Sequence, residues 1–299
     1  MRRLLAVTFL LLCALGPAHA GSVHLLLSDN TDAYLRAAER IQHQLSTQSH
    51  PDKMTVSSIA SAASSAISKQ DLIVSIGEAA VRYSQQHYTE NPQLYSYVDN
   101  SVLPLNSQAP WAAVLLEQPL QRRLDTAVSI ASKRYNNKIV IAVSDNNQAI
   151  KQAIDQLIIP ETVTLDVVSV EANIEPARQV DKALFNAGVL IAVRDPHIWS
   201  GENAKWMLYQ SYKYKVPVIG YSRSFLKAGA LLSVYAALED VATTTADIIN
   251  DWHDSNGKLS REGPHYPPMT ISVNKNIARA LNLSLPENLI QGEQANVRH

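Results

Sequence analysis

The feature that most constrains the fold of this chain is a regular alternation of short apolar runs with amphipathic stretches from Val23 onward. The apolar runs have the length of strands, and the stretches between them repeat apolar residues at helical spacing. This alternation is typical of βαβ units, in which helices join parallel strands. The expected strands are Val23–Leu27, Met54–Ile59, Asp71–Ile76, Leu94–Val98, Lys138–Val143, Val163–Val170, Gly188–Val193, Val216–Gly220 and Met269–Val273.

The two halves of the chain repeat this pattern and join near Trp111–Glu117. We therefore expect an α/β fold with two doubly wound parallel-sheet lobes. The chain after Gly220 is too short for a third domain, so it should cross back to the first lobe and return to the second. The expected parts are a signal peptide at 1–20, an N-terminal lobe from 21–117 and about 234–262, a C-terminal lobe from 118–233 and about 263–290, and a frayed tail at 291–299.

The first twenty residues predict a secretory signal peptide and a periplasmic protein. Two arginines precede the apolar run Leu4–Leu15, and Ala18-His19-Ala20 supplies a cleavage site before Gly21. The apolar run falls short of the ~20 residues that span a bilayer. Cys13 is the only cysteine, and Leu12 before it disfavours lipidation, so no disulfide or thiolate metal site is expected in the mature chain.

Composition and motifs argue against several classes of function. A formal net charge of −1 leaves no basic surface for nucleic acid. Dinucleotide, P-loop, His-Glu-x-x-His and Gly-x-Ser-x-Gly motifs are absent, and 10 glycines supply phosphate-binding loops poorly. No two histidines are four residues apart, and His197 is expected at an exposed helix start. We therefore expect a soluble monomer that is not an enzyme and needs no cofactor or metal.

The expected ligand site lies at the carboxyl ends of the strands, where open α/β sheets bind their ligands. Glycine at position 77 would let the backbone come close to a bound group and leave helix N–H donors facing it. The residues at these strand ends are Ser28, Asp29, Gly77, Glu78, Ser144, Asp145, Arg194, Asp195, Tyr221 and Ser222.

Some of these residues have a second interpretation. Asp29 and Asp145 could cap helices instead of contacting a ligand. Arg194 and Asp195 follow a very apolar strand, which indicates either recognition of a polar group or an ion pair between lobes, and a cap alone explains them less well. Tyr221 belongs to a chain with 12 tyrosines and 3 phenylalanines, and tyrosine suits a site for organic solutes.

Several segments together resemble the uncharacterised ABC-transporter periplasmic substrate-binding family, which includes binders of aromatic amino acids. They are residues 71–77 (DLIVSIG), 216–220 (VPVIG), 225–233 (FLKAGALLS) and 271–286 (ISVNKNIARALNLSLP). The resemblance implies a type I periplasmic-binding-protein fold, with a hinge and a ligand cleft between the lobes. It also implies that residues after Gly77 bind one end of the ligand and that Asp195 binds an amino group. Glu78 and Arg194 stand where the family has small or hydroxyl residues.

The predicted function is the capture of a small organic molecule, amino-acid-like or aromatic, between the two lobes for an ABC-type importer. The partners would then be this ligand and a membrane permease. An alternative is a ligand-sensing partner of a membrane signalling receptor, and a third is an enzyme that acts in the cleft.

Overall fold

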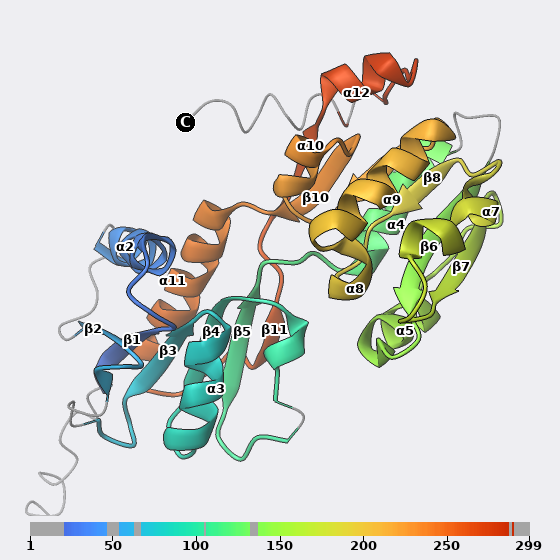
Figure 1. Cartoon of the computed structure of the whole chain (residues 1–299). Coiled ribbons are helices and arrows are strands. Elements are labelled where there is room, and N and C mark those ends of the chain that lie inside the picture. Colours follow the sequence, from blue (N-terminus) through green and yellow to red (C-terminus); the bar gives the residue numbers. More distant parts are fainter. Residues whose placement is uncertain are drawn as a thin grey trace, which may run out of the picture. The chain divides into compact units, whose positions relative to one another are not determined.

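The computed structural model describes residues 21–46, 54–62, 67–104, 106–131, 137–286 and 289, so the expected signal peptide, Cys13 and the tail at 291–299 lie outside it. The chain divides into two compact units, Met1–Leu115 with Leu238–His265 and Leu116–Ala237 with Tyr266–His299. It passes between them after Leu115, Ala237 and His265 (Figure 1). The sequence predicts these crossings after residues 117, 233 and 262.

Unit 1 is a six-stranded sheet, entirely parallel, in the order β11-β5-β4-β3-β1-β2. Helices α2 and α11 pack together on it, and α3 contacts β3 and β4 (Figure 1). The strands are β1 Val23–Leu27, β2 Met54–Ser58, β3 Leu72–Ile76, β4 Gln93–Val98, β5 Trp111–Leu115 and β11 Gly263–His265. The helices are α2 Asp32–Ser46, α3 Glu78–His87, the 3-10 turn η2 Asn100–Val102, and α11 Leu238–Asp254.

Unit 2 is a second six-stranded sheet, in the order β12-β10-β9-β8-β6-β7, in which only the β10–β12 pair is antiparallel. The strands are β6 Lys138–Ser144, β7 Thr164–Val170, β8 Val189–Ile191, β9 Val218–Gly220, β10 Leu232–Ala236 and β12 Met269–Val273. The helices are α4 Leu120–Ala131, α5 Gln148–Asp155, α6 Pro176–Gln179, α7 Asp181–Leu184, α8 Pro196–Trp199, α9 Gly201–Lys213, α10 Ser224–Ala228 and α12 Lys275–Ala280.

Each expected strand is present, and three strands were not predicted. Trp111–Leu115 forms β5 instead of a plain connection, and β10 and β11 arise in the apolar and Pro-rich stretches that follow Gly220. From Ala112 to Leu115 the residues of β5 are fully buried. A strand that is covered on both faces does not alternate apolar with polar residues. Its short run of small apolar residues therefore indicates a strand only weakly in the sequence.

The returning helix α11 completes unit 1. Its Trp252 is fully buried, and the Thr245 and Ser96 hydroxyls form a buried hydrogen bond of 2.7 Å that joins α11 to β4. Because this helix is separated from β4 by more than a hundred residues, the N-terminal unit depends on chain that comes after the second unit. Among the described residues, no helix is long and apolar enough to cross a membrane.

A buried polar pair holds the amino ends of β1 and β3. The Asp71 carboxylate accepts hydrogen bonds from the Ser22 and Ser68 amides at 2.8 and 2.7 Å. His24 Nε2 lies 3.1 Å from the same carboxylate, and its Nδ1 is 2.7 Å from Thr55 Oγ1 on β2. Burial raises the pKa of the Asp71 carboxyl, but these hydrogen bonds outweigh it and hold the pKa below its ordinary value.

We predict that Asp71→Asn destabilises the protein at neutral pH and much less in acid. A carboxyl with a lowered pKa contributes stability above its unfolded pKa of about 4, and this contribution is lost as the pH falls through the folded value. Urea unfolding should show a loss of about 1–3 kcal/mol at pH 7 that shrinks below about pH 4. Asp32→Asn, which changes an exposed carboxylate on α2, is the control. An Asp71→Asn loss that does not depend on pH would contradict this prediction.

Candidate functional site

At the carboxyl edge of the unit 1 sheet, two of the predicted residues, Ser28 and Gly77, lie close together. The Ser28 hydroxyl donates to the Ile76 carbonyl and accepts from the Ala80 amide, both at 3.0 Å, so it ties β1 to the start of α3. Gly77 has a φ of +87°, and a Cβ there would lie 2.4 Å from the Tyr34 ring and 2.7 Å from Ser28 Oγ. Only glycine fits this position without strain.

The two acidic residues of this edge have local roles at the surface. The Asp29 carboxylate accepts the Thr31 amide at 2.7 Å in the turn before α2, which matches the capping interpretation more closely than a ligand contact. Glu78 forms an exposed ion pair of 2.6 Å with Arg82, one turn along α3. Exposed ion pairs of this kind contribute little stability. The side chains of Asp29 and Glu78 are both exposed to solvent.

At the carboxyl edge of unit 2, Asp195 is the centre of a buried hydrogen-bond network. Only 2% of the residue is exposed. Its carboxylate accepts from the Ser144 amide and hydroxyl at 2.8 and 2.7 Å, from Asn147 Nδ2 at 3.1 Å and from the His197 amide at 3.2 Å. Because a carboxylate offers about four acceptor sites, these donors saturate it.

The network gives Asp195 a structural role in addition to a helix cap, which the sequence analysis did not consider. The residue caps α8 and also ties the ends of β6 and β8 to the start of α5, entirely within unit 2. Direct contact with a ligand would require the network to open. His197, expected to be exposed, is the second residue of α8 and half-buried.

Two further predicted residues lie at the surface of this edge and outside the network. Asp145 accepts a hydrogen bond from the Ser169 hydroxyl and lies 3.8 Å from the Lys151 ammonium. The hydroxyl of Ser222 is 2.7 Å from that of Ser224 at the start of α10. These contacts are local and exposed, and none of them reaches the buried groups of the edge.

The remaining predicted residues, Arg194 and Tyr221, join two residues that the sequence analysis missed. Arg123 lies in α4, and its Nη2 donates to Glu117 Oε1 at 2.6 Å. Arg194 Nε lies 3.5 Å from the other oxygen of Glu117. The guanidinium carbons of Arg123 and Arg194 are 5.8 and 5.6 Å from the centre of the Tyr221 ring. We call these four residues the arginine cluster.

The arginine cluster is charged, and its members differ in access to solvent. Arg123 and Glu117 are 1% and 7% exposed, whereas 40% of the Arg194 side chain is exposed. Burial raises the pKa of the Tyr221 phenol against the opposing effect of Arg194, so the hydroxyl stays protonated and can donate. The Tyr221 ring packs on Phe225 with 4.8 Å between centroids, which fixes its position.

The sequence contains one signal that could have revealed Arg123. The apolar face of the helix that begins at Leu120 includes Leu124 and Ala127, and Arg123 falls on that same face at helical spacing. An arginine on a buried face needs a partner, because a buried charge without one is costly. Glu117 gives no comparable signal, since its partners come from distant parts of the chain.

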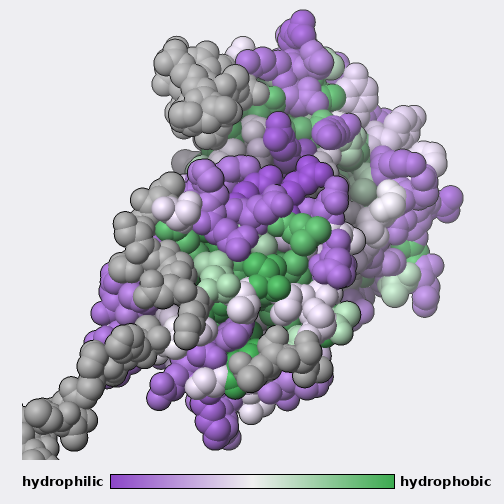
Figure 2. All heavy atoms as spheres, turned by 90° about the vertical axis from the view of Figure 1, so that its left-hand side faces the viewer, coloured by the Kyte–Doolittle hydropathy of each residue, from purple (hydrophilic) through white to green (hydrophobic). Residues whose placement is uncertain are grey.

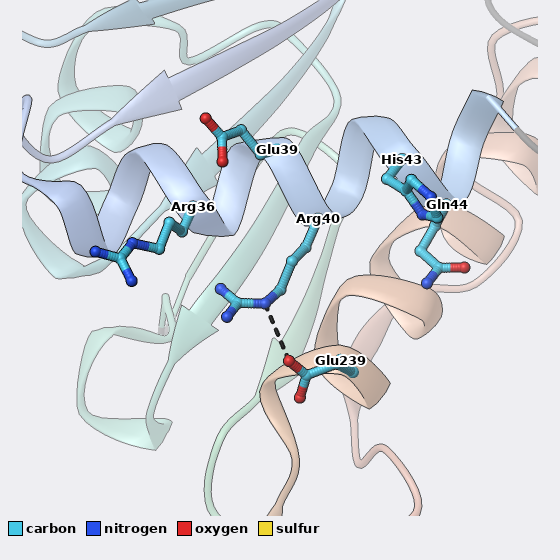
Figure 3. A pocket seen from close by; sticks show the side chains of 6 residues that line it. All are labelled: Arg36, Glu39, Arg40, His43, Gln44 and Glu239. Atoms are coloured by element: carbon cyan, nitrogen blue, oxygen red, sulfur yellow. Dashed lines mark hydrogen bonds and ion pairs between the residues drawn. The ribbon is translucent and has the colours of Figure 1, made fainter. Parts of the chain in front are cut away.

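A surface groove in unit 1 is also lined by several charged side chains (Figure 3). Arg40 on α2 points toward Glu239 on α11 and pairs with it at 3.1 Å, while Arg36 pairs with Asp32. The face that corresponds to the left-hand side of Figure 1 is largely hydrophilic around a central apolar patch (Figure 2). The groove carries both signs of charge on exposed side chains, so it gives no indication of a particular ligand.

The protein has a type I periplasmic-binding fold. It consists of two doubly wound units, the chain crosses between them three times, and each unit has polar residues at the carboxyl edge of its sheet. Within the described ranges, no three histidine, cysteine, aspartate or glutamate side chains are arranged to hold a metal ion.

Solved structures confirm the predicted fold. A substrate-binding protein with adhesive properties from Clostridium difficile, in its ligand-free open form, matches with a TM-score of 0.64, 13% identity and coverage of 90% of this chain and 97% of its own. An ABC domain in complex with L-Trp from Streptococcus pneumonia matches with a TM-score of 0.58 and 14% identity, covering 91% of this chain and 98% of its own. A periplasmic ribose ABC transporter from Conexibacter woesei matches with a TM-score of 0.53 and 12% identity, covering 90% of this chain and 98% of its own. No protein family and no characterised protein matches the sequence itself. At these identities the likeness establishes the fold alone.

Proposed function

We propose that this chain is a periplasmic solute-binding protein that captures a small organic molecule and delivers it to an ABC-type importer. The observation that carries the proposal is the arginine cluster, a charged and partly exposed group at the carboxyl edge of a parallel sheet. This edge is where open α/β sheets bind ligands. The fold supports the proposal, because solved proteins that share it over their whole length include one described in complex with L-Trp and one named for ribose.

The proposal describes binding without turnover. Among the described strand-end residues, the hydroxyls of Ser28, Ser144 and Ser222 are hydrogen-bonded to carbonyl, carboxylate or hydroxyl oxygens and not to a histidine base. A serine nucleophile would need such a base within hydrogen-bond reach. In this proposal the chain is exported through the signal sequence at 1–20 and acts as a monomer together with a membrane permease.

We expect the protein, purified without denaturation, to release a small organic molecule that native mass spectrometry can identify. Unfolding and refolding should remove this molecule and lower the melting temperature of the protein. Adding the molecule back should restore the melting temperature. At a hundredfold excess over Kd, a ligand stabilises the folded state by about 2.7 kcal/mol, which is several degrees for a chain of this size.

Two results would contradict the proposed function. One is the absence of any bound molecule together with no stabilisation by a broad library of small solutes. The other is chemical conversion of the bound molecule over time, which would make the protein an enzyme.

A further inference from the structure

We infer that the arginine cluster is a subsite for the carboxylate group of a small organic acid. The inference rests on the proposed solute-binding function and adds to it the chemical class of the ligand. The four residues of the arginine cluster all belong to unit 2.

The first step is the state of Arg123. A guanidinium has five N–H donors on three nitrogens. In this 1% exposed residue, Nη2 donates to Glu117, whereas Nε and Nη1 have no hydrogen-bond partner among the described residues. Buried polar groups in folded proteins are nearly always hydrogen-bonded, so an unsatisfied one calls for an explanation such as a water or ion that completes it. The free donors of Arg123 therefore indicate an acceptor that the chain does not supply.

The second step concerns the acceptors that the cluster contains. Glu117 is the carboxylate that contacts both Arg123 and Arg194, so the two guanidinium groups share it. The nearby Asp195 carboxylate is already occupied by its own four donors. A ligand carboxylate would supply the acceptor oxygens that Nε and Nη1 of Arg123 lack. A phosphate with two charges would bring a second negative charge close to Glu117.

The third step is geometry and access. Guanidinium groups match carboxylates because their planar forks donate two parallel hydrogen bonds. Arg194 is partly exposed and is held by its contacts with Glu117 and with the Tyr221 ring, so a ligand can reach it without unfolding of the protein. Glu117 thus acts as a positioning residue that holds both arginines before the ligand arrives.

The test compares acids with their uncharged amides, using the full mature chain freed of any co-purified molecule. The probes are L-tryptophan with L-tryptophanamide, phenylacetate with phenylacetamide, and inorganic phosphate, each measured by calorimetry and thermal shift. The co-purified molecule itself is the reference ligand. We expect it to carry a carboxylate, and we expect each acid that binds to bind about 30-fold more tightly than its amide, because the amide replaces one of the two acceptor oxygens by a donor and carries no negative charge.

Three variants connect the result to the cluster. Arg194→Gln, which changes a partly exposed side chain, and Arg123→Lys, which keeps the charge but removes the fork, should each weaken binding of the acid by about tenfold or more and leave binding of the amide nearly unchanged. Arg122→Gln is the matched control, because Arg122 precedes Arg123 on α4 and pairs with Gln118 outside the cluster. It should leave both affinities within about twofold.

The possible failures separate the two proposals. If the co-purified molecule is uncharged, if amides bind as well as acids, or if phosphate binds and the acids do not, the carboxylate subsite is wrong while solute binding stands. If Arg194→Gln and Arg123→Lys weaken acids and amides equally, the cluster is structural. If neither a co-purified molecule nor any probe binds, the solute-binding function itself is contradicted.

Discussion

Replacing Asp195 by alanine should lower the free energy of unfolding by about 4 kcal/mol, which is large for a single substitution. The change deprives four donors of their acceptor at a site where only 2% of the residue is exposed. It also removes the cap of α8 and the tie between β6 and β8. Urea unfolding followed by circular dichroism measures the loss, which corresponds to roughly 8–16 °C in Tm.

Asp145→Ala is the matched control, because Asp145 is also an aspartate just after a strand of unit 2 but is exposed. It should cost less than about 1 kcal/mol. Asp195→Asn keeps the shape of the side chain but replaces one carboxylate oxygen by an NH2 group, whose donors would face the donors of Ser144 and Asn147. Its loss of unfolding free energy should therefore be close to that of Asp195→Ala. If Asp195→Ala left stability unchanged and abolished ligand binding, the direct ligand contact predicted from the sequence would be right instead.

Gly77→Ala should destabilise the protein by about 3 kcal/mol. The position combines two costs, since φ is +87° and the new Cβ would lie 2.4 Å from Tyr34 Cε1 and 2.7 Å from Ser28 Oγ. The hydroxyl of Ser28 cannot move away without losing its hydrogen bonds to the Ile76 carbonyl and the Ala80 amide. Chemical unfolding of the variant measures the loss.

Gly201→Ala separates the two costs of the Gly77 substitution. Gly201 has a φ of +51°, but nothing lies within 4 Å of its added Cβ, so this variant should lose only about 1 kcal/mol from the backbone conformation. Adding Tyr34→Ala to Gly77→Ala should recover part of the difference, because it removes the closest ring. Equal losses for Gly77→Ala and Gly201→Ala would mean that the ring and the hydroxyl shift at little cost.

The sequence predicts the α/β class and the position of most strands because these depend on local patterns. Apolar runs such as Ile73–Ile76 and Ile139–Val143 are long enough, and their flanking helices regular enough, to identify βαβ units without tertiary information. The strands β5, β10 and β11 are different. Their residues are small, mixed or proline-containing, and it is pairing with neighbouring strands that makes them part of a sheet.

The candidate site divides in the same way. The sequence by itself determined which residues stand at the carboxyl ends of the strands, because that position follows from where each apolar run stops. Only the tertiary structure decided what each residue does there. It buried Asp195 under four donors, left Asp145 and Ser222 at the surface, and brought Glu117 and Arg123 to Arg194 and Tyr221. The physical reason is that a hydrogen bond or ion pair depends on distances between segments far apart in the chain, and no local pattern contains those distances.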